Sequence, residues 1–122
     1  MSENMQAGPA LDALIAEKIM GWTRIPRGTH AGLRDEAWTN DDGDSAVFEL
    51  PPYSINIADA WLVVEKLLDK FAAIDVTRYK TYADCEIMED DKDYGGLRPA
   101  ASVEAETVPL VICLAALRSV QP

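Results

Sequence analysis

The first segment with helical periodicity runs from Leu11 to Met20. Its apolar residues recur at intervals of three or four positions, which predicts one apolar face along an amphipathic helix. That face consists of Leu11, Leu14, Ile15 and Ile19. Asp12 and Glu17 fall off the face. Pro9 suits the first turn of a helix, where a backbone N–H lacks a partner, and Gly21 suits its end.

A second amphipathic helix is predicted over residues 57–71. Ser54 or Asn56 can cap its first turn through a side-chain oxygen, and Asp59 lies near the positive end of the helix dipole. The apolar stripe steps by four and three positions and consists of Ile57, Trp61, Val64, Leu68 and Phe71, widened by Leu67. The pattern predicts that Trp61 is buried as the core anchor of this helix.

The last predicted helix begins after Thr107, which can cap it, and has Pro109 in its first turn. Residues Leu110 to Leu117 are apolar on nearly every side. Such a helix is either buried within its own chain or forms an interface with a second copy. We therefore expect a core helix, with a homodimer through this helix as the alternative.

Between the helices the pattern changes to short alternating runs typical of β-strands. The predicted strands are residues 36–39, 45–50, 75–80, 82–89 and 101–105, the last at a sheet edge. Asp-Gly within the turn at 40–44 indicates a hairpin between the first two strands. Residues 23–33 contain a proline and two glycines and are predicted to form a connector.

Length and composition fit one folded domain. The chain has 122 residues, of which 48% are hydrophobic, and this suffices for a core. We expect a flexible arm over residues 1–8 and the domain over residues 9–122. The net charge of −10 repels DNA, RNA and anionic lipid, so it excludes a general nucleic-acid or membrane-surface binder.

The cysteines and the apolar runs indicate a cytoplasmic location. Cys85 and Cys113 do not form a zinc-binding or redox C-x-x-C motif, and Cys113 lies in an apolar run typical of a buried position. The N-terminus has no signal-peptide pattern, and two free thiols suit a reducing compartment. The longest apolar run, Val108 to Leu117, is shorter than the roughly 20 residues that a membrane-spanning helix needs.

No motif predicts catalysis or metal binding. The turn at residues 41–44 looks like a calcium loop, but Trp38 would stand at the first ligand position, where an oxygen is needed. An acidic loop from Asp91 fails because Ser102 would stand in place of a bidentate glutamate. His30 is the single histidine, and the hydrolase, zinc-protease and phosphate-loop motifs are absent from the sequence. We therefore expect no enzyme activity, no metal and no cofactor.

Two acidic stretches are candidate sites for a partner with a basic surface. Residues 35–49 carry six acids and no base, and residues 84–93 carry six acids and one lysine. The candidate carboxylates are Asp41, Asp42, Asp44, Glu89, Asp90, Asp91 and Asp93. The plainer interpretation of both stretches is a solvated surface that keeps the protein soluble.

The connector carries the one local group of basic residues. A cluster of this kind can bind a phosphate or a carboxylate, because arginine forks grip such anions with two hydrogen bonds. Its members are Arg24, Arg27, His30 and Arg34. The alternative is a solvated loop that offsets nearby acids.

Three blocks of sequence carry a family resemblance: Leu11–Trp22, Ile57–Leu67 and Glu104–Leu117. Together they resemble the phage ABA-sandwich domain family. The resemblance implies a bacteriophage or prophage origin and a small α/β/α sandwich. In this fold about three helices pack on a mainly antiparallel sheet of four to five short strands, which agrees with the periodicity. The family offers no catalytic motif, and the positions that match it look structural: Leu11, Trp22, Trp61 and Leu110.

A phage protein without catalytic motifs is expected to act by binding in the host cytoplasm. Its charge favours an acidic inhibitor that docks on a basic host protein, such as a defence complex. The alternative is a sponge that sequesters a small anionic signal such as a cyclic nucleotide, held by the basic cluster. The plainest interpretation of its function is a structural or regulatory phage protein.

Overall fold

The computed structural model describes residues 5–25, 37–39, 46–47 and 49–120. Its helices are α1 (Pro9–Lys18), α2 (Ile57–Leu67) and α3 (Val108–Val120). One antiparallel sheet consists of β1 (Thr23–Ile25), β2 (Ala37–Thr39) and β3 (Ala46–Val47). A larger antiparallel sheet consists of β4 (Ala73–Arg78), β5 (Ala83–Asp90) and β6 (Leu97–Ala105), with β5 in the centre.

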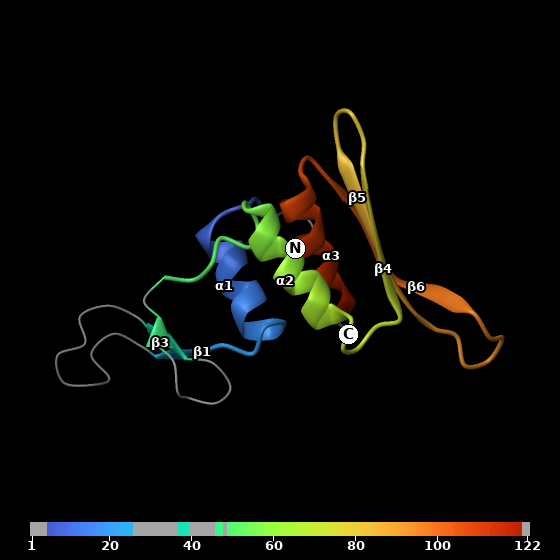
Figure 1. Cartoon of the computed structure of the whole chain (residues 1–122), viewed down its shortest axis with the longest axis horizontal. Helices are drawn as coiled ribbons and strands as arrows, with labels where there is room; N and C mark the ends of the chain where they lie inside the picture. Colours follow the sequence, from blue (N-terminus) through green and yellow to red (C-terminus); the bar gives the residue numbers. More distant parts are fainter. Residues whose placement is uncertain (1–4, 26–36, 40–45, 48, 121–122) are drawn as a thin grey trace.

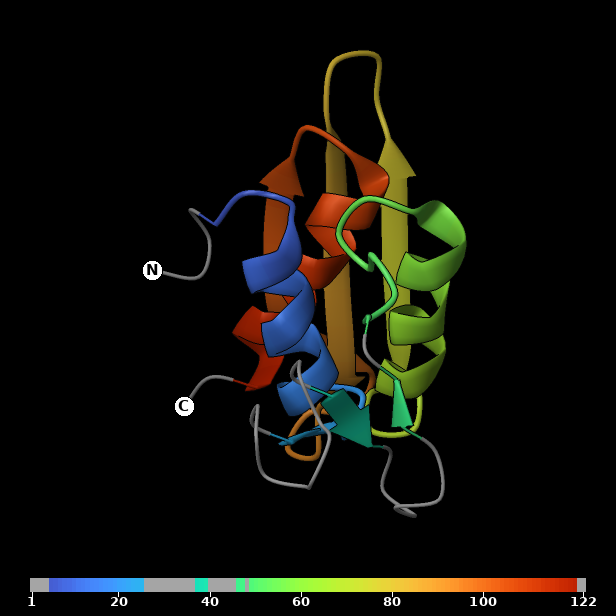
Figure 2. The ribbon, with the colours of Figure 1, turned by 90° about the vertical axis from the view of Figure 1, so that its left-hand side faces the viewer.

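The fold is layered around α3. The large sheet packs against one side of α3, and α1 and α2 each pack on the other side (Figures 1 and 2). The small sheet lies beyond the C-terminal end of α1 (Figure 2). The three helices thus share one side of the large sheet, and none of the described elements covers its other side (Figure 1).

The prediction of a small α/β sandwich with three helices on an antiparallel sheet is confirmed. The strand number differs from the expected four to five, because the described residues form six strands in two sheets. The additional strand is β1, which occupies the start of the predicted connector and pairs with β2. The rest of that connector and the hairpin turn at 40–44 lie outside the described residues.

The last helix is the centre of the core. Residues Val111 to Leu117 of α3 are all buried, because α1, α2 and the large sheet surround them. Thr107 caps the helix as predicted, since its Oγ1 accepts a hydrogen bond from the Leu110 N–H at 3.3 Å. Burial within the chain accounts for the apolar character of α3, and a homodimer through it stays a prediction.

The buried face of α2 matches the predicted stripe only in part, because Val64, Leu67 and Phe71 are buried as predicted. Ala60, Val63, Val64 and Leu67 are buried against the core, whereas Ile57 and Leu68 are about half exposed. Trp61 is 49% exposed, so its assignment as the core anchor is wrong. Apolar residues occupy more than one side of this helix, and packing against α3 selects the side with the small Ala60.

Asp12 and Ser54 form a buried link between α1 and the segment before α2. Asp12 is only 6% exposed, although it falls off the predicted apolar face. Its Oδ1 accepts hydrogen bonds from the backbone N–H of Ser54 at 2.8 Å and from Ser54 Oγ at 2.7 Å. The Gly8 N–H in turn donates to Ser54 Oγ at 2.9 Å. Ser54 therefore holds the start of α1, and Asn56 caps α2 through the Asp59 N–H at 3.1 Å.

Candidate functional site

The predicted acidic residues fall into two groups. One group lies outside the described residues, and the other lies at the end of β5 and in the loop after it. Asp41, Asp42 and Asp44 are not among the described residues. Glu89 Oε1 pairs with Arg98 Nε at 3.0 Å across β5 and β6. An ion pair of this kind neutralises Glu89, so Glu89 is a poor candidate for steering a basic partner.

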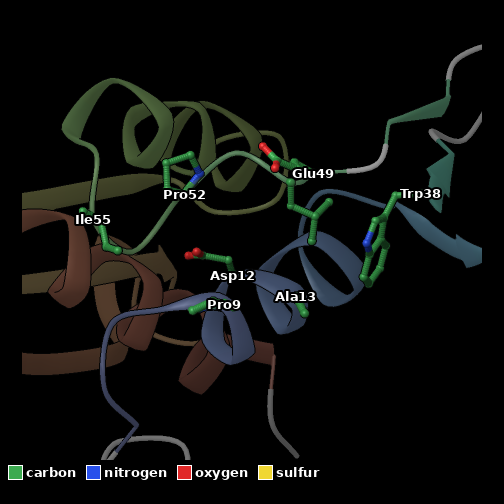
Figure 3. Close-up of a pocket in the computed structure, with 8 residues that line it drawn as sticks. Pro9, Asp12, Ala13, Trp38, Glu49, Pro52 and Ile55 are labelled. Carbon is green, nitrogen blue, oxygen red and sulfur yellow. The ribbon is translucent and has the colours of Figure 1, made fainter. Parts of the chain in front are cut away.

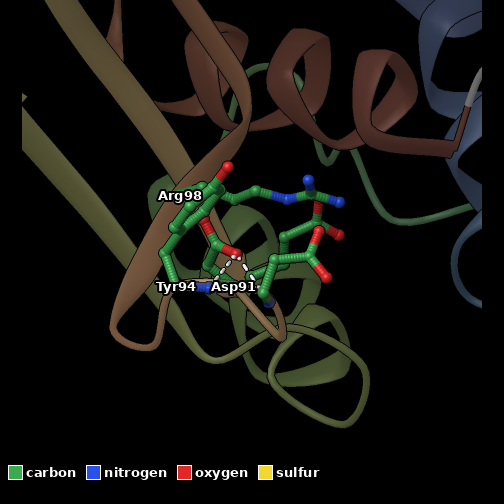
Figure 4. Close-up of polar contacts among 5 residues, drawn as sticks. Asp91, Tyr94 and Arg98 are labelled. Atoms are coloured by element: carbon green, nitrogen blue, oxygen red, sulfur yellow. Dashed lines mark hydrogen bonds and ion pairs between the residues drawn. The ribbon is translucent and has the colours of Figure 1, made fainter.

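Asp91 has a structural role in the loop between β5 and β6. Its Oδ1 accepts hydrogen bonds from the backbone N–H groups of Asp93 and Tyr94, at 3.0 and 3.1 Å (Figure 4). This is an Asx turn, in which the side chain replaces a backbone acceptor. Asp90 and Asp93 are exposed beside it, so of this predicted group they remain available to a partner.

The predicted basic cluster is represented in the described part of the chain by Arg24, which is exposed on β1 opposite Trp38. Arg27, His30 and Arg34 lie outside the described residues. The anion-binding alternative therefore stays a prediction.

The structure brings together a different set of carboxylates on the large sheet. In β5, Ala83, Cys85 and Ile87 are buried toward the helices, so the alternate residues face the uncovered side. Directly opposed residues share a face, and the register pairs Asp75 with Glu86 and Asp84 with Glu104. We call these four residues, Asp75, Asp84, Glu86 and Glu104, the acidic sheet face.

No basic residue stands opposite any carboxylate of the acidic sheet face. The remaining register partners of Asp84 and Glu86 are Thr77 on β4 and Ser102 on β6, which are neutral. Two pairs of like charges therefore stand directly across from each other, an arrangement that destabilises a sheet. The face is thus a concentrated negative surface with no compensating cation in the strand register.

The charge of this face acts on neighbouring groups. Tyr79 and Tyr82 stack at one end of the sheet, with ring centroids 4.6 Å apart. The Asp84 carboxylate raises the pKa of the Tyr79 phenol, because a second negative charge beside it is unfavourable. On the buried side, desolvation raises the pKa of Cys85 to about 12, and the nearby carboxylates of Asp84, Asp75 and Glu86 add to this effect.

None of the four carboxylates of the acidic sheet face is among the candidate site residues predicted from the sequence. Asp84 and Glu86 lie in the acidic stretch at 84–93, but Asp75 and Glu104 lie outside both predicted stretches. The signal that could have found them is the alternation of polar and apolar residues in all three strands. Cross-strand pairing brings their polar positions onto one face, although they are up to 29 residues apart in the chain.

Two further findings concern metals and membranes. Within the described residues, no three histidine, cysteine, aspartate or glutamate side chains converge as metal ligands, and the predicted acidic turn at 41–44 lies outside them. Across the same part of the chain, every helix is too short or too polar to cross a bilayer.

The comparisons with known proteins agree with the resemblance of the three helical blocks. No curated protein and no solved structure matches the chain. The model of the phage ABA sandwich domain matches residues 13–117, which cover the described elements from the latter part of α1 to most of α3. The chain therefore belongs to the phage ABA sandwich domain family.

Proposed function

We propose that the protein is a phage accessory protein that inhibits a host protein by binding to it. In this proposal the acidic sheet face docks on a basic surface of the host protein, such as a groove that normally binds nucleic acid. The closely spaced carboxylates would occupy the positions of phosphate groups. The interaction needs no catalytic group and no cofactor.

The observation that carries the proposal is the opposition of like charges across the strands. A sheet is stabilised by opposite-charge or apolar cross-strand pairs, and like charges opposite each other reduce stability. Asp75–Glu86 and Asp84–Glu104 are two pairs of like charge. Their β5 members, Asp84 and Glu86, are two positions apart and so share one face of the strand. A basic partner would neutralise this repulsion, so the surface becomes favourable only in a complex.

The shape of the face also supports docking on another macromolecule. The helices lie on one side of the large sheet, which leaves a broad strand surface on the other (Figure 1). Tyr79 and Tyr82 stand partly exposed at its end. Tyrosine supplies contact area together with a polar hydroxyl, which is why it is enriched at protein interfaces.

The test is capture of host proteins from a lysate by the wild-type chain and by two charge variants. The first variant neutralises the acidic sheet face: Asp75→Asn, Asp84→Asn, Glu86→Gln and Glu104→Gln. The matched control removes the same number of charges from exposed positions elsewhere: Glu17→Gln, Glu65→Gln, Asp69→Asn and Asp93→Asn. We expect a basic host protein to bind wild type and control at low salt and to be lost from the first variant.

Salt provides the second readout. Steering by surface charge is screened over a Debye length of about 8–10 Å, so binding of the wild type should weaken strongly with added salt. Equal loss of binding in both variants would show that only net charge matters, and undiminished binding of the first variant would show that another surface carries the interaction. Either result would contradict the proposal.

A further inference from the structure

Four large apolar side chains are exposed along the outer side of α2. Ile57, Trp61, Leu62 and Leu68 are 53%, 49%, 45% and 48% exposed, and Leu68 is the residue that caps the end of the helix. We call these four residues the α2 patch. The helix lies at one edge of the helical layer (Figure 2), and none of the described elements covers the patch. Unlike the buried apolar side chains of α3, those of the α2 patch are open to a partner. The groove between α1 and the segment before α2 (Figure 3) is a separate feature.

The spacing of the α2 patch spreads it over the exposed half of the helix. Ile57, Trp61 and Leu68 are separated by four and seven positions, so they share one side of the helix. Leu62 lies about 100° further around the helix, because one turn takes about 3.6 residues. The core residues of α2 occupy the remaining side. The patch is therefore broad enough to contact another helix along the whole length of α2.

The area of the α2 patch fits one side of a reversible interface. Half-exposed side chains of this size each leave about 100 Å² open, so the patch offers about 400 Å² of apolar surface. A standard interface covers about 800 Å² of each partner, and somewhat more than half of that area is apolar. The patch therefore supplies most of the apolar part of such an interface. An area of this size suits a complex that dissociates on dilution.

The charges along α2 are complementary to those of a second copy in the antiparallel orientation. Asp59 lies in the first turn and Lys66 in the last turn, and both lie at the rim of the patch next to Leu62, three positions before it and four positions after it. A two-fold axis at the middle of the helix places Asp59 of one copy opposite Lys66 of the other. The same axis places Ile57 opposite Leu68. A parallel pair would instead bring like charges together.

Two further acids suit the same orientation. Glu65 and Asp69 are exposed in the C-terminal half of α2 and just after it. In an antiparallel pair they lie beside the N-terminal end of the partner's helix, where the helix dipole is positive. An anionic membrane surface would offer no such compensation, since it repels these acids and the net charge of −10.

We infer that the protein forms a homodimer in which the two α2 helices pack antiparallel through the α2 patch. The self-complementary order of charges favours a second copy over an unrelated protein, which would need a matching order of its own. The helix lies on the helical side of the large sheet, and the acidic sheet face lies on the far side (Figure 1), so the dimer leaves both acidic sheet faces open. The inference does not depend on the proposed docking, because its test uses the purified chain alone.

The first experiment is sedimentation equilibrium of the purified chain over a series of concentrations, at low and at high salt. We expect the mass to rise from 13.4 kDa toward twice that value at both salts, because salt does not screen apolar contacts. Trp61→Glu should raise the dissociation constant by at least about thirtyfold, the effect of losing an aromatic anchor. Leu97→Glu is the matched control, because it places the same charge on a half-exposed leucine of β6, and it should dimerise as the wild type does. A monomer at every concentration, or equal weakening in both variants, would overturn the inference.

Charge reversal tests the antiparallel pairing on exposed residues that the core does not need. Asp59→Lys and Lys66→Glu each create two repulsive contacts at the rim of the dimer, so each variant alone should dimerise about fivefold or more weakly than the wild type. An equimolar mixture of the two variants should form a heterodimer of nearly wild-type affinity, because every rim contact in it again joins opposite charges. A mixture that associates as weakly as the single variants would overturn the antiparallel pairing of α2.

Discussion

At the scale of the residue, burial on α2 decides what a substitution costs. Leu67 is 4% exposed and lies in the core cluster, whereas Trp61 is 49% exposed on the other side of the helix. We expect Leu67→Ala to lower the free energy of unfolding by about 2–5 kcal/mol, because it leaves a cavity. Trp61→Ala should lower it by about 1 kcal/mol or less. Urea melts of both variants measure this difference, and a larger loss for Trp61→Ala would place the indole in the core.

The same residues show what a sequence pattern can determine. Helical spacing located α2 and its cap, and the wholly apolar run located α3 as a core helix. The pattern placed Val64, Leu67 and Phe71 correctly but not Trp61, because apolar residues occupy more than one side of α2 and tertiary packing decides which of them are buried. Asp12 was also unpredictable, since its burial requires Ser54, which is 42 residues away in the chain.

At the scale of the element, the large sheet carries an internal repulsion. Glu86 of β5 stands opposite Asp75 of β4, and Asp84 of β5 stands opposite Glu104 of β6. We expect Glu86→Gln and Glu104→Gln each to raise the free energy of unfolding at low salt. Cross-strand pair energies set the size of this gain at roughly 0.2–1 kcal/mol.

Salt distinguishes this repulsion from a simple packing change. Added salt should stabilise the wild type relative to both variants, because it screens the like charges. Thermal melts at low and high salt provide the comparison. If Glu86→Gln destabilised the sheet at low salt, the carboxylate would have a stabilising partner and the account of the acidic sheet face would be wrong.

The sheet was less predictable than the helices. The alternation located β4, β5 and β6 within a few residues, but β6 begins at Leu97 and not near residue 101. Register determines which carboxylates share a face, and register depends on long-range pairing. A search for acidic runs along the chain therefore found the Asx turn at Asp91 and the ion-paired Glu89, and it missed Asp75 and Glu104.

At the scale of the whole molecule, the buried thiols link stability to pH. Burial raises the pKa of Cys85 from 9.0 to about 12 and also raises the pKa of Cys113. Above pH 9 the unfolded chain loses these protons while the folded chain keeps them, so the folded state loses stability as pH rises. Below pH 9 this contribution is fully present.

We therefore expect the free energy of unfolding to fall as the pH rises from about 9 toward about 12, by up to roughly 1.4 kcal/mol per thiol for each unit above the unfolded pKa. Urea melts across this range measure the slope. The double variant Cys85→Ala, Cys113→Ala should be less stable throughout but should show a shallower decline. An equal slope in both proteins would mean that the thiols are not protected from ionisation in the folded state.

The surface that binds a partner is reported most directly by the carboxylates themselves. The most direct test labels exposed carboxyl groups with a carbodiimide and an amine, with and without the captured host protein, and quantifies each site by mass spectrometry. The proposed docking predicts that labelling falls at Asp75, Asp84, Glu86 and Glu104 in the complex, while Glu17, Glu65 and Asp69 on the helical side label as before. Protection of the helical carboxylates with the sheet carboxylates unchanged would contradict it.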